Sequence, residues 1–277
     1  MTRLGTPRRV RAAPAIPIAV LLAPSLLVIL AAAERPLRIP VLLVLVAGLV
    51  LARRLGDGRT RAAWAAPVPV AVMLACALVP EPTVLGSGAD CGGAVPLRVI
   101  RRSIEMSIVL AATFVAWRVG AVPASALRLR RPSPAVAAAA LICFVAAAPL
   151  AVLVGPVVAA PFFGPISLRA PGVLALVPIV VAALANAVQE EVAYRGAWLG
   201  WGTLALGPAV AVGAQAAAFG LAHAGSDFTG PQLPVLVAMV AGGLAAGLIA
   251  QRTGSLALPI ALHAAADVPM ALYAVCG

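Results

Sequence analysis

The sequence predicts an all-α fold, a polytopic transmembrane helix bundle of eight or nine spans. Of the 277 residues, 63% are hydrophobic and only 10% are charged, whereas soluble domains usually carry about a quarter charged residues. Long apolar runs recur along the whole chain, and a helix needs roughly 20 apolar residues to cross a bilayer core. The runs are too long for barrel strands, and apolar and polar residues do not alternate in them as they do in such strands. Helices are therefore expected, because they satisfy their own backbone groups in lipid.

Nine apolar runs are the candidate spans. They are Ala15–Ala33, Ile39–Ala52, Ala62–Pro80, Met106–Gly120, Ala135–Ala160, Gly172–Gln189, Pro208–Ala222, Pro234–Ala250 and Ser255–Val275. The second, fourth and seventh are short and need their flanks to span. The first is longer than the apolar part of a signal peptide, so we expect it to be retained as a span. The basic connector Pro123–Pro134 divides the chain into residues 1–122, with about four spans, and residues 123–277, with about five.

The basic residues, all arginines, are unevenly distributed between the predicted loops. With the N-terminus inside, thirteen of the twenty fall on the cytoplasmic side and six outside, the latter in loops such as Glu81–Arg102. This asymmetry follows the positive-inside rule, and basic loops beside anionic headgroups account for the net charge of +11. We therefore expect the lipid bilayer, and no nucleic acid, as a partner. The lysine-free, alanine-rich composition suggests a high-GC bacterium, and hence a multi-pass protein of its inner (plasma) membrane with a cytoplasmic N-terminus.

Three acidic residues and both histidines lie in or at the end of predicted spans, although such groups are costly there and usually face a protein interior or a water-filled cavity. They are Glu190, Glu191, His223, His263 and Asp267. Glu191 can pair with Arg195, four residues later on the same helix face. Glu190 points about 100° away and has no such partner, which suits a general base.

Two further i,i+4 turns complete the pattern, and three helices could each bring one polar turn to a common site. Phe219 precedes His223 in AFGLAH, and His263 precedes Asp267 in LHAAAD. Each turn has a structural explanation as well: the Glu191–Arg195 pair could be a buried stabilising pair, and a core histidine is often simply hydrogen-bonded. The joint occurrence of all three turns favours a functional site.

In this order, the motifs Glu-Glu-x-x-x-Arg, Phe-x-x-x-His and His-x-x-x-Asn/Asp resemble the CPBP family. These are the CAAX-protease and bacteriocin-processing (Abi) intramembrane proteases, related to the Ras-converting CAAX endopeptidase. Here the motifs read EEVAYR (Glu190–Arg195), FGLAH (Phe219–His223) and HAAAD (His263–Asp267). The resemblance covers about Pro134–Ala271.

The resemblance implies a glutamate-dependent endopeptidase that acts on a peptide or membrane-protein substrate and needs no metal cofactor. By this analogy Glu190 and His223 would activate the attacking water, and His263 with Asp267 would stabilise the oxyanion. The residues that orient the site would be Glu191, Arg195 and Phe219. Many members carry Asn where this chain has Asp267, which would donate a hydrogen bond only when protonated and could instead orient His263 as an imidazolium.

Two other functions use the same residues. In a zinc-dependent metalloprotease, Glu190, His223 and His263 would be the metal ligands, although the chain has no H-E-x-x-H motif. A transporter or proton relay would also bury ionisable groups, although the sequence shows no internal repeat. Prenylated CAAX proteins, bacteriocin-like peptides and membrane-protein fragments all fit as substrates.

The predicted depths of Glu190 and His223 disagree. Glu190 is expected near the cytoplasmic end of its span, whereas His223 lies fifteen residues beyond Pro208, or about 22 Å along a helix. We expect the two to meet only if Pro208 begins well below the membrane surface or Gly196–Gly207 dips back.

Overall fold

The computed structural model describes residues 17–79, 95–146, 153, 173–224 and 232–276. Within these ranges the chain is helical and contains no strand, apart from a single bridge between Leu129 and Ser255. The expected all-α fold is confirmed for the described residues.

Three described helical stretches are long and apolar enough to cross a membrane: Arg35–Leu55, Leu176–Leu206 and Gln232–Thr253. Three shorter helices are also apolar, namely Ile18–Ala33, Pro134–Ala146 and Ala257–Met270. The chain is therefore a helical membrane protein, and the total of eight or nine spans stays a prediction. The boundary at residue 122 also stays a prediction, and most of the Glu81–Arg102 loop lies outside the described residues.

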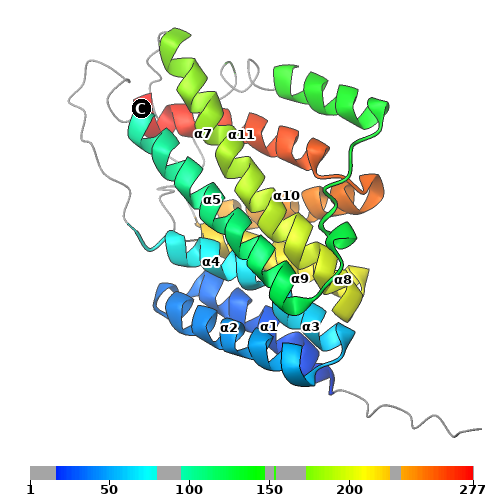
Figure 1. Cartoon of the computed structure of the whole chain (residues 1–277). Coiled ribbons are helices and arrows are strands. Elements are labelled where there is room, and N and C mark those ends of the chain that lie inside the picture. The colour runs from blue at the N-terminus through cyan, green and yellow to red at the C-terminus, as the bar shows by residue number, and fades with distance from the viewer. Residues whose placement is uncertain (1–16, 80–94, 147–152, 154–172, 225–231, 277) are drawn as a thin grey trace, which may run out of the picture.

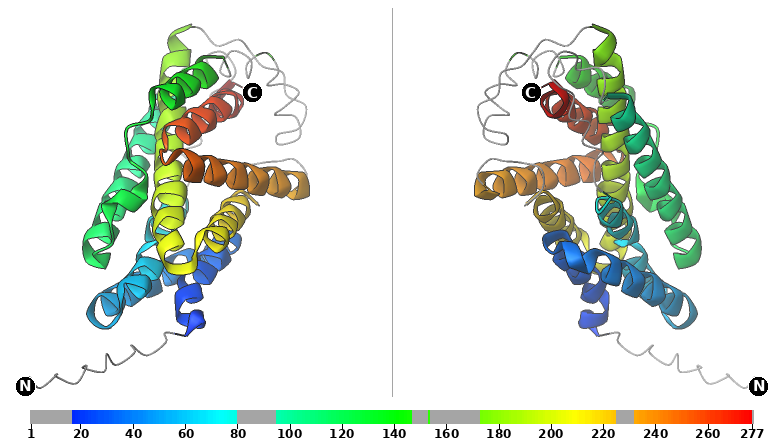
Figure 2. Two further views of the ribbon diagram at one scale, coloured as in Figure 1. Left: turned by 90° about the vertical axis from the view of Figure 1, so that its right-hand side faces the viewer. Right: turned by 90° about the vertical axis from the view of Figure 1, so that its left-hand side faces the viewer.

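Helices α1 to α4 gather at one end of the molecule, opposite the start of α7 and the end of α11, whereas α5 runs from near the end of α11 toward them and packs along α7 (Figures 1 and 2). Their bounds are α1 Ile18–Ala33, α2 Arg38–Leu55, α3 Gly58–Ala65, α4 Val68–Cys76 and α5 Val95–Gly120. The run Ala62–Pro80, expected as one span, forms the end of α3 and all of α4. The interruption falls at Pro67, which has no N–H to continue the helix. In contrast, α5 begins well before Met106, so its flank extends the short run as expected.

The central element is a long helical stretch built from three consecutive segments (Figure 1). They are α7 (Val173–Glu191), the π-helical segment η3 (Val192–Trp198) and α8 (Leu199–Leu206). Glu190 lies near the end of α7, as expected, but the helical stretch continues past it through η3 and α8 to Leu206. The glycines after Arg195 do not break the helix, because they admit neighbouring backbone: a Cβ at Gly200 would overlap the Ala126 carbonyl. Close approach of this kind is a common use of glycine.

The chain reverses after α8 at Gly207, whose φ of +85° is accessible to glycine without strain. Helix α9 (Pro208–His223) follows directly. Glu190 lies about as far before this reversal as His223 lies after it. The reversal therefore removes the difference in depth that the sequence suggested, and Gly196–Gly207 does not need to dip back.

The last two helices, α10 (Gln232–Thr253) and α11 (Ala257–Cys276), complete the bundle. Helix α10 lies crosswise to α7 and α8 (Figure 2) and packs against α9. The contact is close because Gly243 meets the backbone of Ala216, and the Gln215 amide donates to the Gly243 carbonyl at 2.9 Å. Helix α11 packs along α7.

Hydrogen bonds from buried side chains tie the central element to the front helices. The Trp198 indole donates to Ser25 Oγ at 3.3 Å, and the Trp201 indole donates to the Pro123 carbonyl at 3.1 Å. Both tryptophans are fully buried in the core that joins α1–α5 to η3, α8 and α9. The front helices therefore hold η3, and with it the end of α7, in place.

Candidate active site

The end of α7 and the middle of α11 bring three carboxylates around one imidazole. His263 Nδ1 lies 2.8 Å from Glu191 Oε1. On the other side of the ring, His263 Nε2 lies 3.7 Å from Glu190 Oε2 and 3.7 Å from Asp267 Oδ1. An ionised carboxylate only accepts hydrogen bonds, so His263 Nδ1 carries the proton in its bond to Glu191.

The pair of Glu191 and Arg195 expected from the sequence is confirmed. Arg195 Nη1 donates to Glu191 Oε1 at 2.8 Å, and both side chains are about 1% exposed. The guanidinium carbon also lies 4.4 Å from the centre of the Phe219 ring, within the range of a cation–π contact. The second glutamate thus binds Arg195 and His263 through the same oxygen.

The motif on α9 reaches the same place through an aromatic ring. The Phe219 ring centre lies 4.6 Å from that of His223 and 5.9 Å from that of His263. His223 Nδ1 lies 2.7 Å from the Phe219 carbonyl oxygen, which can only accept, so Nδ1 donates. In the neutral ring Nε2 is then the nitrogen that can take up a proton. The turns from α7, α9 and α11 therefore meet, as the sequence analysis expected.

The π-helical segment η3 begins directly after Glu191. Single π turns inside α-helices are frequently found at functional sites. Here a carbonyl of the π-helical turn accepts a hydrogen bond from another segment of the chain: Arg128 Nη1 donates to the Arg195 carbonyl at 3.0 Å. Gly196 also faces the Leu127 carbonyl, which lies 3.3 Å from where a Cβ would be. The connector after α5 thus supports the backbone that carries Arg195.

This arrangement can be compared with known proteins. A family model described as "Type II CAAX prenyl endopeptidase Rce1-like" matches residues 172–269. The family suspected from the three motifs is confirmed. The match includes all three motif turns but begins later than the resemblance expected, at residue 172 rather than near Pro134. No curated protein and no solved structure matches the chain. The Rce1-like segment thus marks the chain as a membrane peptidase.

The Rce1-like segment contains a polar residue that the sequence analysis missed. Asn186 lies one turn before Glu190 on α7, and its Nδ2 donates to Glu190 Oε1 at 3.1 Å and to Asp267 Oδ2 at 2.8 Å. Its own carbonyl oxygen accepts from Gln189 Nε2 at 3.1 Å. The i,i+4 spacing of Asn186 and Glu190 in an apolar helix was a visible signal. Its partnership with Asp267, 81 residues away, was not visible.

Several polar atoms of this cluster are buried without a hydrogen-bond partner among the described residues. They include Glu190 Oε2, Glu191 Oε2 and Arg195 Nε. Such atoms are rare in folded proteins and call for an explanation. Glu190 Oε2 is distinctive because it faces His263 Nε2 at 3.7 Å, too far for a direct hydrogen bond.

The zinc-site alternative requires several ligand side chains that converge on one point. Among the described residues, no three His, Cys, Asp or Glu side chains converge in an arrangement that could hold a metal ion. Glu190, His223 and His263 therefore do not fit as a zinc-ligand set in this arrangement. Metal independence itself stays a prediction.

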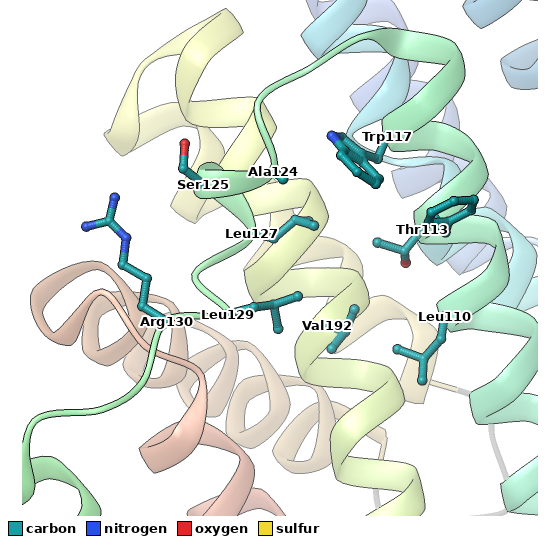
Figure 3. Close-up of a pocket in the computed structure, with 10 residues that line it drawn as sticks. Leu110, Thr113, Trp117, Ala124, Ser125, Leu127, Leu129, Arg130 and Val192 are labelled. Atoms are coloured by element: carbon teal, nitrogen blue, oxygen red, sulfur yellow. The ribbon is translucent and has the colours of Figure 1, made fainter.

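The other side of η3 borders an apolar groove of about 490 Å³. It is lined by Leu110, Thr113, Phe114, Trp117, Ala124, Ser125, Leu127, Leu129, Arg130 and Val192. Figure 3 shows the Arg130 side chain pointing away from this apolar lining. Only Val192 in the lining comes from the Rce1-like segment, and none of the ionisable motif residues takes part. The groove is therefore distinct from the carboxylate cluster.

Proposed function

We propose that the chain is an intramembrane endopeptidase in which Glu190 activates the water that attacks the scissile peptide bond. One observation carries this proposal. Glu190 Oε2 is buried, has no hydrogen-bond partner among the described residues and lies 3.7 Å from His263 Nε2. A water molecule can reach both atoms at hydrogen-bond distance, which would place it between a base and a donor.

The proposed reaction begins with proton transfer from this water to Glu190 Oε2. The water oxygen bonds to the carbonyl carbon, and the carbonyl oxygen becomes an oxyanion. Collapse of this intermediate breaks the C–N bond, and the proton on Glu190 passes to the departing amine. The products are one new carboxyl group and one amine. His223, whose Nε2 can take up a proton, would assist this transfer as a second acid–base group.

His263 would stabilise the oxyanion through an N–H at Nε2. Its Nδ1 proton is already engaged by Glu191, so the ring orientation is set before substrate arrives. A donor held in advance toward the developing charge is a large contribution to acyl-transfer catalysis. Asp267, 3.7 Å from the same nitrogen, supports an imidazolium that carries this proton.

Glu191 and Arg195 would orient the site rather than react. Arg195 neutralises Glu191, and Glu191 in turn holds His263. Phe219 packs against Arg195 and both histidines and would shield the Glu191–Arg195 pair from water. Removal of any of these contacts should misplace His263.

The family description suggests the substrate class: a C-terminal CAAX peptide whose cysteine carries a prenyl group. We place the enzyme in the plasma membrane with its N-terminus in the cytoplasm, as the arginine distribution predicts. The test uses the purified full chain in proteoliposomes and a quenched fluorescent peptide with a farnesylated CAAX end. A matching peptide without the farnesyl group is the control, and mass spectrometry locates the cleaved bond.

The wild type should cleave the farnesylated peptide, and Glu190→Gln should lose at least the 10²–10⁴-fold typical of general acid–base catalysis. Glutamine keeps the shape of Glu190 and can still accept from Asn186, so folding should be unaffected. Equal rates for the wild type and Glu190→Gln would contradict the assignment of the base. Equal cleavage of the two peptides would contradict the prenylated substrate but not the peptidase.

A further inference from the structure

The carboxamide of Asn186 makes three hydrogen bonds, and its orientation follows from its partners. The carbonyl oxygen accepts from Gln189 Nε2, so the NH₂ group must face the two carboxylates. An amide NH₂ has two hydrogens, and here one goes to Glu190 and one to Asp267. The opposite orientation would direct an oxygen toward two acids. Asn186 therefore joins α7 to α11 at the catalytic turn.

The two carboxylates need such a group between them. Glu190 and Asp267 lie close to the same amide nitrogen and to the same imidazole nitrogen, His263 Nε2. Two acids this close, one buried and one partly buried, repel each other when both are ionised. His263 Nε2 can offer a single hydrogen, but Asn186 offers one to each acid. A hydroxyl has one hydrogen and an aliphatic side chain has none, so neither could replace it.

We propose that Asn186 is a positioning residue for the peptidase reaction, which holds Glu190 by Oε1 so that Oε2 faces the attacking water and His263. This inference rests on the proposed function. Asn186 does not touch the reacting atoms itself. It decides which oxygen of Glu190 is bound and which is available, and it keeps Asp267 at a fixed place beside His263. Gln189, 1% exposed, holds the amide in this orientation.

The first test removes the amide. Asn186→Ala should lower kcat on the farnesylated peptide by about 10²-fold, the size of effect expected when a reacting group is misplaced by about 1 Å. KM should change by less than about threefold, because the amide does not contact the substrate. The matched control is Gln215→Leu, which removes another fully buried amide, one that bonds the Gly243 carbonyl outside the site. It should lower thermal stability but leave kcat per folded molecule near that of the wild type.

The second test exchanges the acid and the amide. Asn186→Asp places three carboxylates together and should lower kcat at least as much as alanine does. Adding Asp267→Asn in that background restores one amide among the acids and should raise kcat at least tenfold. The same Asp267→Asn change in the wild-type background should not raise kcat. If Asn186 served only in packing, Asp267→Asn would not raise kcat in the Asn186→Asp background while failing to raise it in the wild type.

The outcomes separate this inference from the proposed function. An active wild type with an inactive Glu190→Gln variant and an unaffected Asn186→Ala variant would overturn only the role of Asn186. Failure of Asp267→Asn to improve the Asn186→Asp variant would do the same.

If the wild type does not cleave the peptide, the proposed function fails for this substrate, and thermal unfolding of the full chain then tests the bridge. Asn186→Ala and Asp267→Ala should be non-additive, with the double variant melting no lower than the less stable single variant. Additive losses in melting temperature would overturn the bridge.

Discussion

Replacing Arg195 by methionine should destabilise the chain strongly, because it leaves a buried charge without its counter-ion. Glu191 is fully buried and accepts a hydrogen bond from Arg195 Nη1 at 2.8 Å. Breaking one partner of a buried ion pair typically costs about 3–5 kcal/mol. Loss of the cation–π contact with Phe219, 4.4 Å away, would add roughly 0.5–2 kcal/mol.

The two contributions sum to roughly 3.5–7 kcal/mol, and the Glu191–His263 bond, which remains in the variant, keeps the expected loss near the lower end of this range. For a chain of this size 1 kcal/mol shifts the melting temperature by roughly 2–4 °C. We therefore expect Arg195→Met to melt at least about 7 °C below the wild type, measured by thermal unfolding of the purified protein in detergent. Methionine retains most of the aliphatic volume, so the loss reports on the charge.

The double variant Glu191→Gln with Arg195→Met is the decisive control. It removes both charges, and neutral replacement of a buried pair is often tolerated. It should recover at least half of the loss, because the carbonyl oxygen of the introduced glutamine can still accept from His263 Nδ1. Glu190→Gln should melt within about 2 °C of the wild type. The reasoning would be refuted if Arg195→Met melted like Glu190→Gln, or if the double variant were less stable than Arg195→Met.

Four further predictions concern other parts of the chain. Gly200→Ala should reduce the yield of folded protein sharply in a detergent extraction assay, because the new Cβ would overlap the Ala126 carbonyl; normal yield would argue against this packing. Asp57→Ala should cost about 1 kcal/mol at pH 7, as loss of an N-cap does. Hydrogen bonds from Thr60 lower the pKa of Asp57, so this stabilisation should be present above about pH 4 and disappear as the pH falls further; a pH-independent difference between the two melting curves would contradict the cap. Peptidase activity should survive thorough chelation, whereas loss with chelator and recovery with added zinc would support the metal alternative. Cys91 should react with an impermeant thiol reagent applied outside intact cells, and protection of a free Cys91 thiol would reverse the predicted topology.

Local features of the chain were predictable because they depend on residues close in sequence. The Glu191–Arg195 pair follows from i,i+4 spacing on one helix, and the membrane setting follows from composition. The order of the three motifs was enough to suggest the family. These inferences needed no knowledge of how distant helices pack.

Two predicted span boundaries differ from the structure, one because of packing and one because of a proline. The span predicted at Gly172–Gln189 continues through η3 and α8 to Leu206, where Gly196 and Gly200 allow close contact with the connector after α5. The run Ala62–Pro80 suggested one span, but Pro67 falls where α3 passes into α4. The continuation through η3 and α8 could not be predicted, because whether a glycine ends a helix or admits a neighbouring backbone depends on the element packed against it.

By itself the sequence determined the membrane environment of this protein, its helical class and the chemical groups of its site. These features depend on hydrophobicity and on i,i+4 spacing, which are local properties of the chain. Only the tertiary structure decided which groups meet. The reversal at Gly207 brings His223 back to the depth of Glu190, and the packing of α11 on α7 places Asp267 against Asn186. Both results depend on the length of the π-interrupted helix and on contacts between residues far apart in the chain. Such contacts arise from the packing of whole helices, which no local pattern of residues encodes.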